Sequence, residues 1–176
     1  RCRLGELFAV LSGKGGTGKT SVCAGLAEAL ALQDKTVLCV DCDVGLRNLD
    51  IALGLSQIGT LSFQDVCSGN YTLDQAARHS TYPTLSFLTA PVNCTPDEVD
   101  KEVFGEMLQQ ARKMFDYVLL DAPAGIEAGF QLSAAFADRV ILVTSADPAA
   151  IRDASRASDV LEAMGKKNVR MILNRV

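Results

Sequence analysis

The nine residues 12–20, with the sequence SGKGGTGKT, constrain this chain more than any other segment. They fit the phosphate-binding pattern G-x-x-x-x-G-K-[ST], whose fixed positions are occupied by Gly13, Gly18, Lys19 and Thr20. An apolar run, 7–11, precedes the pattern and has the composition of a buried strand. Apolar residues spaced as on one face of a helix follow it. A strand, a glycine-rich loop and a helix in this order predict a phosphate-binding loop.

Each residue type in this loop has a chemical reason. Glycine lets the backbone turn through positive φ and approach an anion without an intervening Cβ. The N–H groups of the loop and of the first helical turn can then donate to phosphate oxygens, which the helix dipole favours. Lys19 supplies positive charge for the terminal phosphates, and the Thr20 hydroxyl is placed to bind Mg²⁺. We therefore expect the phosphates of a nucleotide and Mg²⁺ as the ligands.

Aspartates end two further strand-like runs. Asp41 and Asp43 close the run 36–41, and carboxylates at i and i+2 on an extended strand point the same way. They would face the phosphate loop if the two strands are neighbours, one to hold a magnesium-bound water and the other to orient an attacking water. A solvated turn is the alternative for this segment. Asp121 follows the apolar run 117–120, as in the Walker B strand that brings a carboxylate to Mg²⁺.

The whole chain, 1–176, reads as a single domain in which strands alternate with helices. The predicted strands are 7–11, 36–40, 85–88, 117–120, 140–143 and 169–173. The predicted helices are 19–32, 99–114, 131–137 and 151–164. Most of the strand runs are continuously apolar, as in strands buried on both faces of a parallel sheet. We predict an α/β fold: a three-layer, open, mainly parallel sheet with helices on both faces, of the P-loop NTPase (SIMIBI-like) class. The irregular stretch 56–83 is interpreted as helix and loop.

Composition narrows the function further. Apolar residues make up 48% of the chain, charged residues 22%, and the net charge is −4, so a broad nucleic-acid-binding surface is not indicated. A small basic cluster, Lys166, Lys167 and Arg170, is explained equally well by a solvated helix end. No apolar run is long enough to cross a membrane. Both ends of the chain look trimmed, so we expect C-terminal strands and any terminal membrane helix to be missing from it.

The six cysteines are expected to be reduced. Cys39 and Cys42 have C-x-x-C spacing, but residues three apart on a strand face opposite sides, so their thiols should not converge on a metal. The other four, Cys23 among them, are interpreted as isolated. His79, the one histidine, has no obvious partner in the sequence and is interpreted as a surface or loop residue.

Taken together, these segments resemble the MinD septum-site-determining ATPases of the MinD/ParA group, along residues 7–176. The resemblance rests on SGKGGTGKT at 12–20, on DCDVGLRNLD at 41–50, on DAPAGIE at 121–127, and on Arg152-Asp153 after Asp147-Pro148. Ala122 and Ala149 depart from the family pattern, which has serine and glutamate there.

The resemblance implies a role for each matching position. The residues implied to bind the nucleotide are Gly13, Gly15, Gly16, Thr17, Gly18, Lys19, Thr20, Ser21 and Asn174. Among them, Ser21 would contact the α-phosphate and Asn174 the adenine, although a strand-terminal turn explains Asn174 equally well. Thr20 would bind Mg²⁺ directly, with Asp41 and Asp121 in its outer shell. The residues implied to be catalytic are Lys19, Asp43, which would position the hydrolytic water, and Lys14, which would reach the nucleotide of a partner subunit.

The implied function is an ATP-dependent dimerisation switch with slow, Mg²⁺-dependent ATP hydrolysis. It would position the cell-division inhibitor and so select the division site. Implied partners are a second copy, a MinC-like inhibitor, a MinE-like activator in some systems, and the membrane through a C-terminal helix absent from this chain. The implied location is the cytoplasm with cycling to the inner face of the cell membrane, and a plastid stroma stays open. The main alternative is a ParA-type DNA-segregation ATPase; an iron–sulfur carrier and a non-hydrolysing scaffold are two others.

Overall fold

The structure is a computed structural model that describes residues 3–44, 52–53 and 61–175. Its centre is a seven-stranded sheet with the strand order β3-β4-β2-β5-β1-β6-β7. The strands are β1 (Glu6–Leu11), β2 (Val37–Asp41), β3 (Arg78–His79), β4 (Leu85–Leu88), β5 (Tyr117–Asp121), β6 (Arg139–Ser145) and β7 (Val169–Asn174). All pairings are parallel except that of β3 with β4. The predicted α/β class is confirmed.

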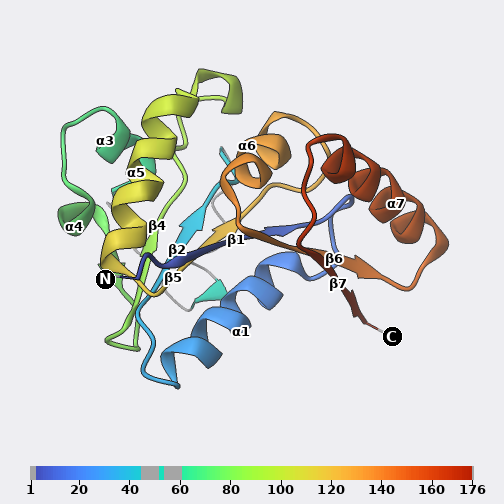
Figure 1. Ribbon diagram of the computed structural model, residues 1–176, viewed down its shortest axis with the longest axis horizontal. Helices are drawn as coiled ribbons and strands as arrows, with labels where there is room; N and C mark the ends of the chain where they lie inside the picture. The colour runs from blue at the N-terminus through green and yellow to red at the C-terminus, as the bar shows by residue number, and fades with distance from the viewer. Residues whose placement is uncertain (1–2, 45–51, 54–60, 176) are drawn as a thin grey trace.

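Helices cover both faces of the sheet, as Figure 1 shows. They are α1 (Lys19–Ala31), α3 (Phe63–Cys67), α4 (Leu73–Ala76), α5 (Lys101–Met114), α6 (Ala128–Phe136) and α7 (Pro148–Ala163), with a 3₁₀ turn at Pro96–Glu98. Helix α1 lies on one face, while α5, α6 and α7 lie on the other. The faces are therefore covered unequally, but the three-layer arrangement is the predicted one.

Alternating residues of the central strands pack into two separate hydrophobic cores, one on each face of the sheet. In β1, Leu7, Ala9 and Leu11 join the core under α5, α6 and α7, whereas Val10 joins the core under α1. All four are fully buried. Strands buried on both faces need apolar residues at every position, which is why the sequence shows continuous apolar runs instead of alternation.

The parallel pairing brings the carboxyl ends of the strands to one edge of the sheet, where ligands bind in open α/β folds. Asp41 at the end of β2 is in register with Asp121 at the end of β5. Strand β5 lies between β2 and β1, so β2 is not the direct neighbour of the strand that leads into the phosphate loop. The Walker B strand occupies that position.

The structure differs most from the predicted elements in where helices begin and in one short strand. Helix α7 begins at Pro148, three residues earlier than expected, because Asp147 caps it by accepting from the N–H of Ala150 at 3.0 Å and proline suits the first turn. Within the irregular stretch, the two-residue strand β3 pairs antiparallel with β4 and was not predicted. Two residues are too few to show a periodic pattern.

Candidate nucleotide-binding site

The loop 12–18 joins β1 to α1 and surrounds a cavity of about 400 Å³. Gly16 and Gly18 take positive φ values of 77° and 85°, which a residue with a Cβ rarely adopts. The cavity is lined by Ser12, Gly15, Gly16, Thr17, Gly18, Lys19, Thr20, Ser21, Asp43, Ala124 and Arg175. Most of the residues expected to bind the nucleotide thus share one cavity, and its backbone geometry suits phosphate.

Gly13 lies in the loop and packs against the backbone of α7. A Cβ built on Gly13 would come within 2.3 Å of the backbone oxygen of Asp153. The loop can therefore rest directly against α7 only if position 13 has no side chain. This contact is between segments 140 residues apart, and the motif pattern alone gives no indication of it.

Three side chains form a polar cluster beside the cavity, two of them buried and Thr20 partly buried. The Nζ of Lys19 lies 2.6 Å from Oδ1 of Asp121, and the Thr20 hydroxyl donates to Oδ2 of the same carboxylate at 2.9 Å. Lys19 is 8% exposed and Asp121 is 1% exposed. The pairing offsets the desolvation that each buried charge would otherwise suffer. Lys19 and Thr20, the last two residues of the loop motif, thus both contact the aspartate that ends β5.

The oxygen ligands near this cluster suit Mg²⁺. Asp41 is 1% exposed and its Oδ1 accepts from the N–H of Asp43 at 2.9 Å, while Asp43 lines the cavity. Carboxylate and hydroxyl oxygens are the ligands that Mg²⁺ prefers. Among the described residues, the buried hydroxyls of Ser12 and Thr17 make no hydrogen bond within the protein. Such hydroxyls beside a polar cavity fit a ligand that supplies their partners.

Lys14 points out of the cavity toward α7. Its Nζ lies 3.4 Å from Oδ1 of Asp147, with the two side chains 43% and 49% exposed. Hydrogen bonds from the Ser145 hydroxyl and from the N–H of Ala150, together with the charge of Lys14, lower the pKa of Asp147 to about 2. Lys14 and Lys19 therefore occupy different environments, although they are only five positions apart in the sequence.

Two residues at the end of β7 contact the loop from the other side. The Nδ2 of Asn174 donates to the carbonyl of Thr17 at 2.9 Å, and Nη1 of Arg175 donates to the carbonyl of Gly16 at 2.8 Å. The side-chain amide of Asn174 thus contacts the loop backbone, and its contact with adenine stays a prediction. Arg175 was not predicted as a site residue, although its position directly after Asn174 in the sequence was an available signal.

Part of the motif set falls outside the described residues. The stretch GLRNLD at 45–50, which carries much of the family resemblance, is among them. In the stretch 121–127, by contrast, the N–H of Gly125 donates to the carbonyl of Ser12 at 3.0 Å, and φ of Gly125 is 97°. This links the segment after β5 directly to the phosphate loop.

Cys39 and Cys42 lie on opposite faces of the sheet. Cys39 packs in the core under α1 and Cys42 in the core on the other face of the sheet, as the strand geometry predicts. Cys23 is not isolated, because α1 places it against Cys39, and a hydrogen bond between the two side chains together with burial raises the pKa of Cys23. Within the described part of the chain, no group of three or more histidine, cysteine or acidic side chains is arranged to hold a metal ion.

Lys166 of the basic cluster and His79 also have structural partners. Lys166 donates to the carbonyls of Ala135 and Ala137 at the end of α6, at 2.9 and 3.1 Å. His79 is exposed, as expected of a surface residue, although it belongs to strand β3, and its Nδ1 lies 3.3 Å from the hydroxyl of Ser86 on β4. The sequence could not reveal these partners, since they come from other strands and helices.

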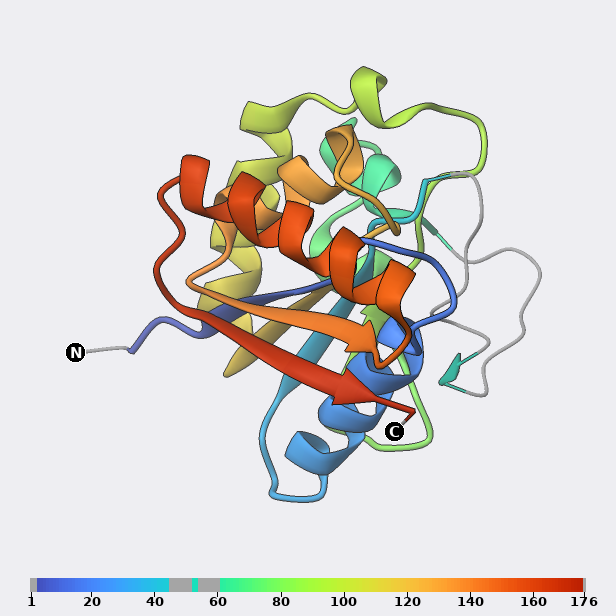
Figure 2. The same cartoon turned by 90° about the vertical axis from the view of Figure 1, so that its right-hand side faces the viewer.

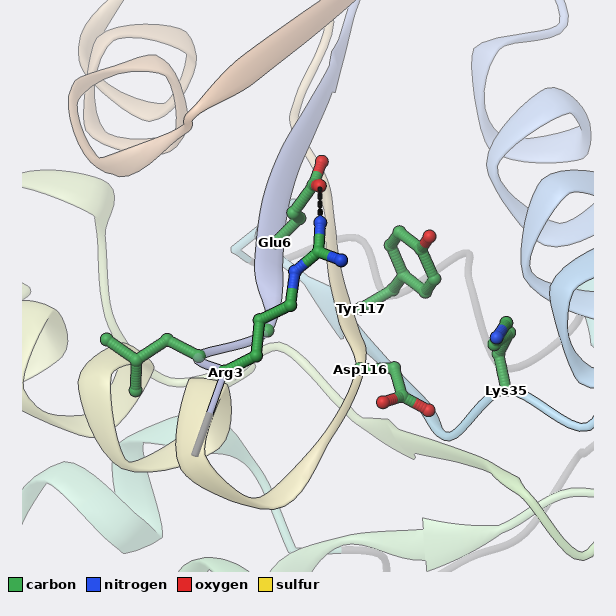
Figure 3. A pocket seen from close by; sticks show the side chains of 7 residues that line it. Arg3, Glu6, Lys35, Asp116 and Tyr117 are labelled. Atoms are coloured by element: carbon green, nitrogen blue, oxygen red, sulfur yellow. Dashed lines mark hydrogen bonds and ion pairs between the residues drawn. The ribbon is translucent and has the colours of Figure 1, made fainter. Parts of the chain in front are cut away.

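A smaller hollow of about 120 Å³ lies at the opposite ends of β1 and β5. Figure 3 shows Arg3, Glu6, Lys35, Asp116 and Tyr117 around it, with an ion pair between Arg3 and Glu6. The side chain of Arg3 is 89% exposed. This hollow is remote from the phosphate loop because it lies at the amino ends of the strands, and it contains none of the predicted site residues.

The whole chain is similar to known nucleotide-binding proteins. The sequence profile of the CobQ/CobB/MinD/ParA nucleotide binding domain matches residues 8–176. The septum site-determining protein MinD of Synechocystis sp. is 40% identical over 174 residues, which are 98% of this chain and 65% of the relative, so the chain spans less than two thirds of that relative.

Two solved structures extend the comparison. The MinC:MinD cell division protein complex of Aquifex aeolicus is similar with a TM-score of 0.88 and 37% identity, over 97% of this chain and 69% of the other. The septum site-determining protein MinD of Pyrococcus horikoshii, solved with Mg-ADP, is similar with a TM-score of 0.80 and 27% identity, over 97% of this chain and 70% of the other. Among the described residues, no helix is long and apolar enough to span a membrane.

Proposed function

This chain belongs to the CobQ/CobB/MinD/ParA nucleotide-binding family, within it to the MinD proteins, and from that premise we propose that it is an ATP-dependent dimerisation switch. In this proposal, Mg²⁺-ATP binds in the cavity of the phosphate loop and two copies associate. Slow hydrolysis then returns them to single chains. The switch positions the cell-division inhibitor and so contributes to division-site selection.

One observation carries the proposal: the two lysines of the loop face different ways. Lys19 is buried against Asp121 inside the cavity, whereas the exposed Lys14 contacts Asp147 outside it. A lysine outside its own cavity is poorly placed for its own phosphates and well placed for a nucleotide on another molecule. In a dimer that forms around the nucleotide, Lys14 of one copy would contact the nucleotide bound to the other copy.

The chemistry assigned to the site is phosphoryl transfer to water. Mg²⁺, held by Thr20 with Asp41 and Asp121 nearby, would neutralise charge on the phosphates. Lys19 and the loop N–H groups bind the β- and γ-phosphates, and Asp43 orients a water molecule beside them. Since the described part of the site contains no histidine or other strong base, catalysis rests on positioning and on charge, which suits slow turnover.

The remaining partners follow from the relatives. The Aquifex MinD is named in a complex with MinC, which supports a MinC-like inhibitor as a partner. A MinE-like activator and the membrane are proposed from the family resemblance alone. A ParA-type role on DNA is not favoured by any contact described here: the net charge is −4 and Lys166 of the basic cluster is engaged by helix carbonyls. Salt-dependent DNA binding would reopen that alternative.

The deciding experiment is molar mass by light scattering in Mg²⁺ with ATP or ADP. The protein used carries Asp43→Ala, which is expected to block hydrolysis and preserve the loaded state. We expect a dimer with ATP and a monomer with ADP. Adding Lys14→Ala should abolish the dimer while ATP still binds. If the molar mass is the same with ATP and with ADP, the dimerisation switch is refuted, and the chain would be a nucleotide-binding domain with a different function.

A further inference from the structure

The hydroxyl of Ser12 is buried beside the nucleotide cavity without a partner. Ser12 is the first residue after β1, is 1% exposed, and belongs to the lining of the cavity. Within the described part of the chain, its Oγ makes no hydrogen bond. A buried hydroxyl in this state has given up water and gained nothing in return, which costs free energy. A ligand that accepts a hydrogen bond from Ser12 would remove this cost.

The neighbours of Ser12 indicate which part of a nucleotide it would meet. Val10, two residues before it on β1, is in register with Asp121 at the end of β5. The carbonyl of Ser12 accepts from the N–H of Gly125, in the segment that follows Asp121, at 3.0 Å. Figure 2 shows the loop that follows β1, in blue, on the side of the molecule to which the arrowheads of β6 and β7 point. Ser12 therefore lies next to the segment that carries the aspartate assigned to Mg²⁺.

The other buried hydroxyl of the loop lies toward a different end of the cavity. Thr17 also has an unpartnered hydroxyl, but its carbonyl is held by Asn174 at the end of β7. Strand β7 lies on the opposite side of β1 from β5. Ser12 instead shares the cavity lining with Asp43, to which the proposed function assigns the attacking water. The position of Ser12 thus favours the terminal phosphate as its acceptor.

We propose that the Ser12 hydroxyl donates a hydrogen bond to the γ-phosphate of bound ATP and so helps the site to distinguish ATP from ADP. A hydrogen bond to a charged phosphate oxygen is stronger than one between neutral groups. With ADP bound, the hydroxyl would stay without a partner. The inference rests on the proposed function for the placement of ATP in this cavity, and it does not depend on dimerisation or on any protein partner.

The test compares a nucleotide that has a γ-phosphate with one that lacks it. Dissociation constants of the non-hydrolysable analogue AMP-PNP and of ADP, both in Mg²⁺, are measured by calorimetry for the wild-type protein and Ser12→Ala. We expect Ser12→Ala to weaken AMP-PNP about tenfold and to change ADP binding less than about twofold. The variant should therefore lose most of the preference that this hydroxyl gives to the triphosphate.

The stability of the nucleotide-free protein supplies a second measurement. Since the hydroxyl has no partner there, Ser12→Ala should leave the midpoint of urea unfolding unchanged or raise it. Ser86→Ala is the matched control, because Ser86 is also buried, at 3% exposed, but its hydroxyl contacts His79. Strands β2 and β5 separate its strand, β4, from β1. The control should lower the midpoint and leave both dissociation constants unchanged.

Three results would overturn the proposal. If Ser12→Ala weakens AMP-PNP and ADP equally, the hydroxyl serves the inner phosphates or the shape of the loop. If neither constant changes, the hydroxyl does not contact the nucleotide. If the unfolding midpoint falls as far as in Ser86→Ala, the hydroxyl is bonded within the protein. Should Ser12→Ala fail to fold, Ser12→Gly, which also lacks the hydroxyl, gives the same comparison.

The outcomes also separate this inference from the proposed function. A selective loss of AMP-PNP binding in Ser12→Ala, with no nucleotide-dependent dimerisation of the wild type, would refute the switch and support the role of Ser12. A wild type that dimerises with AMP-PNP, together with unchanged affinities in Ser12→Ala, would refute this inference alone. A wild type that binds neither nucleotide would refute both.

Discussion

Lys19 of the phosphate loop and Asp121 at the end of β5 form a buried ion pair, with 2.6 Å between Nζ and Oδ1. The same carboxylate accepts from the hydroxyl of Thr20 at 2.9 Å. One aspartate thus engages both of the loop side chains that the proposed function assigns to phosphate and Mg²⁺. Binding of Mg²⁺-ATP must redistribute these contacts, because the ammonium group cannot serve Asp121 and a phosphate equally well at once.

Replacing Lys19 by alanine should destabilise the protein as well as abolish ATP binding. The carboxylate of Asp121, 1% exposed, would lose its cation, and removal of one partner of a buried pair costs about 3 kcal/mol or more. Urea unfolding measures the stability and calorimetry the binding. Lys14→Ala is the control, since its exposed pair with Asp147 contributes little. Equal losses of stability for the two variants would contradict the buried pairing.

Asp121→Asn should change the magnesium dependence of ATP binding. The neutral amide competes less strongly for Lys19 but is a poorer ligand near Mg²⁺. We expect the variant to bind ATP at least as tightly as the wild type in EDTA, and more weakly, by about tenfold, in Mg²⁺. Titration of ATP in each buffer checks this. An equal loss in both buffers would indicate that Asp121 acts only on the structure of the loop.

Gly13→Ala should lower the stability of the protein, whereas Gly15→Ala should weaken ATP binding without lowering the stability. A Cβ at position 13 meets the Asp153 backbone at 2.3 Å and would push α7 away, so we expect a loss of stability of about 2 kcal/mol. Position 15 has no atom within 4 Å of the built Cβ, so Gly15→Ala should be as stable as the wild type. Because Gly15 lines the cavity, the added methyl group should still weaken ATP binding. Thermal unfolding and ATP titration on both variants distinguish the two effects.

The lowered pKa of Asp147 predicts a specific acid dependence. The folded protein holds this carboxylate ionised to about pH 2, chiefly through the Ser145 hydroxyl, whereas the unfolded chain protonates it near pH 4. Its contribution to stability is therefore fully present above pH 4 and is lost as the pH falls from about 4 to about 2. Unfolding of the wild type and Asp147→Asn at pH 6, 4 and 3 measures the difference, which should shrink with falling pH. A constant difference would show that the carboxylate charge is not involved.

Local patterns in the sequence were sufficient for most of the fold. Apolar, β-rich runs located six of the strands. Most of these strands are buried on both faces and are therefore largely apolar, whereas the edge strand β7 is mostly exposed. Strand β3 was not predicted because two residues carry no period. The start of α7 was placed late although Asp147-Pro148 is a clear start signal. The prediction that Cys23 is isolated was wrong, because its neighbour Cys39 belongs to another element, strand β2.

What the sequence determined by itself is the class of ligand, because the spacing of glycines, lysine and threonine in 12–20 is a local property of one loop. Only the tertiary structure decided which distant groups complete that loop. It paired Lys19 with Asp121, set Lys14 against Asp147, rested Gly13 on α7, and brought Arg175 to Gly16. These partners lie more than 100 residues away in the chain, so the strand order of the folded sheet, and not spacing along the sequence, fixes which of them meet.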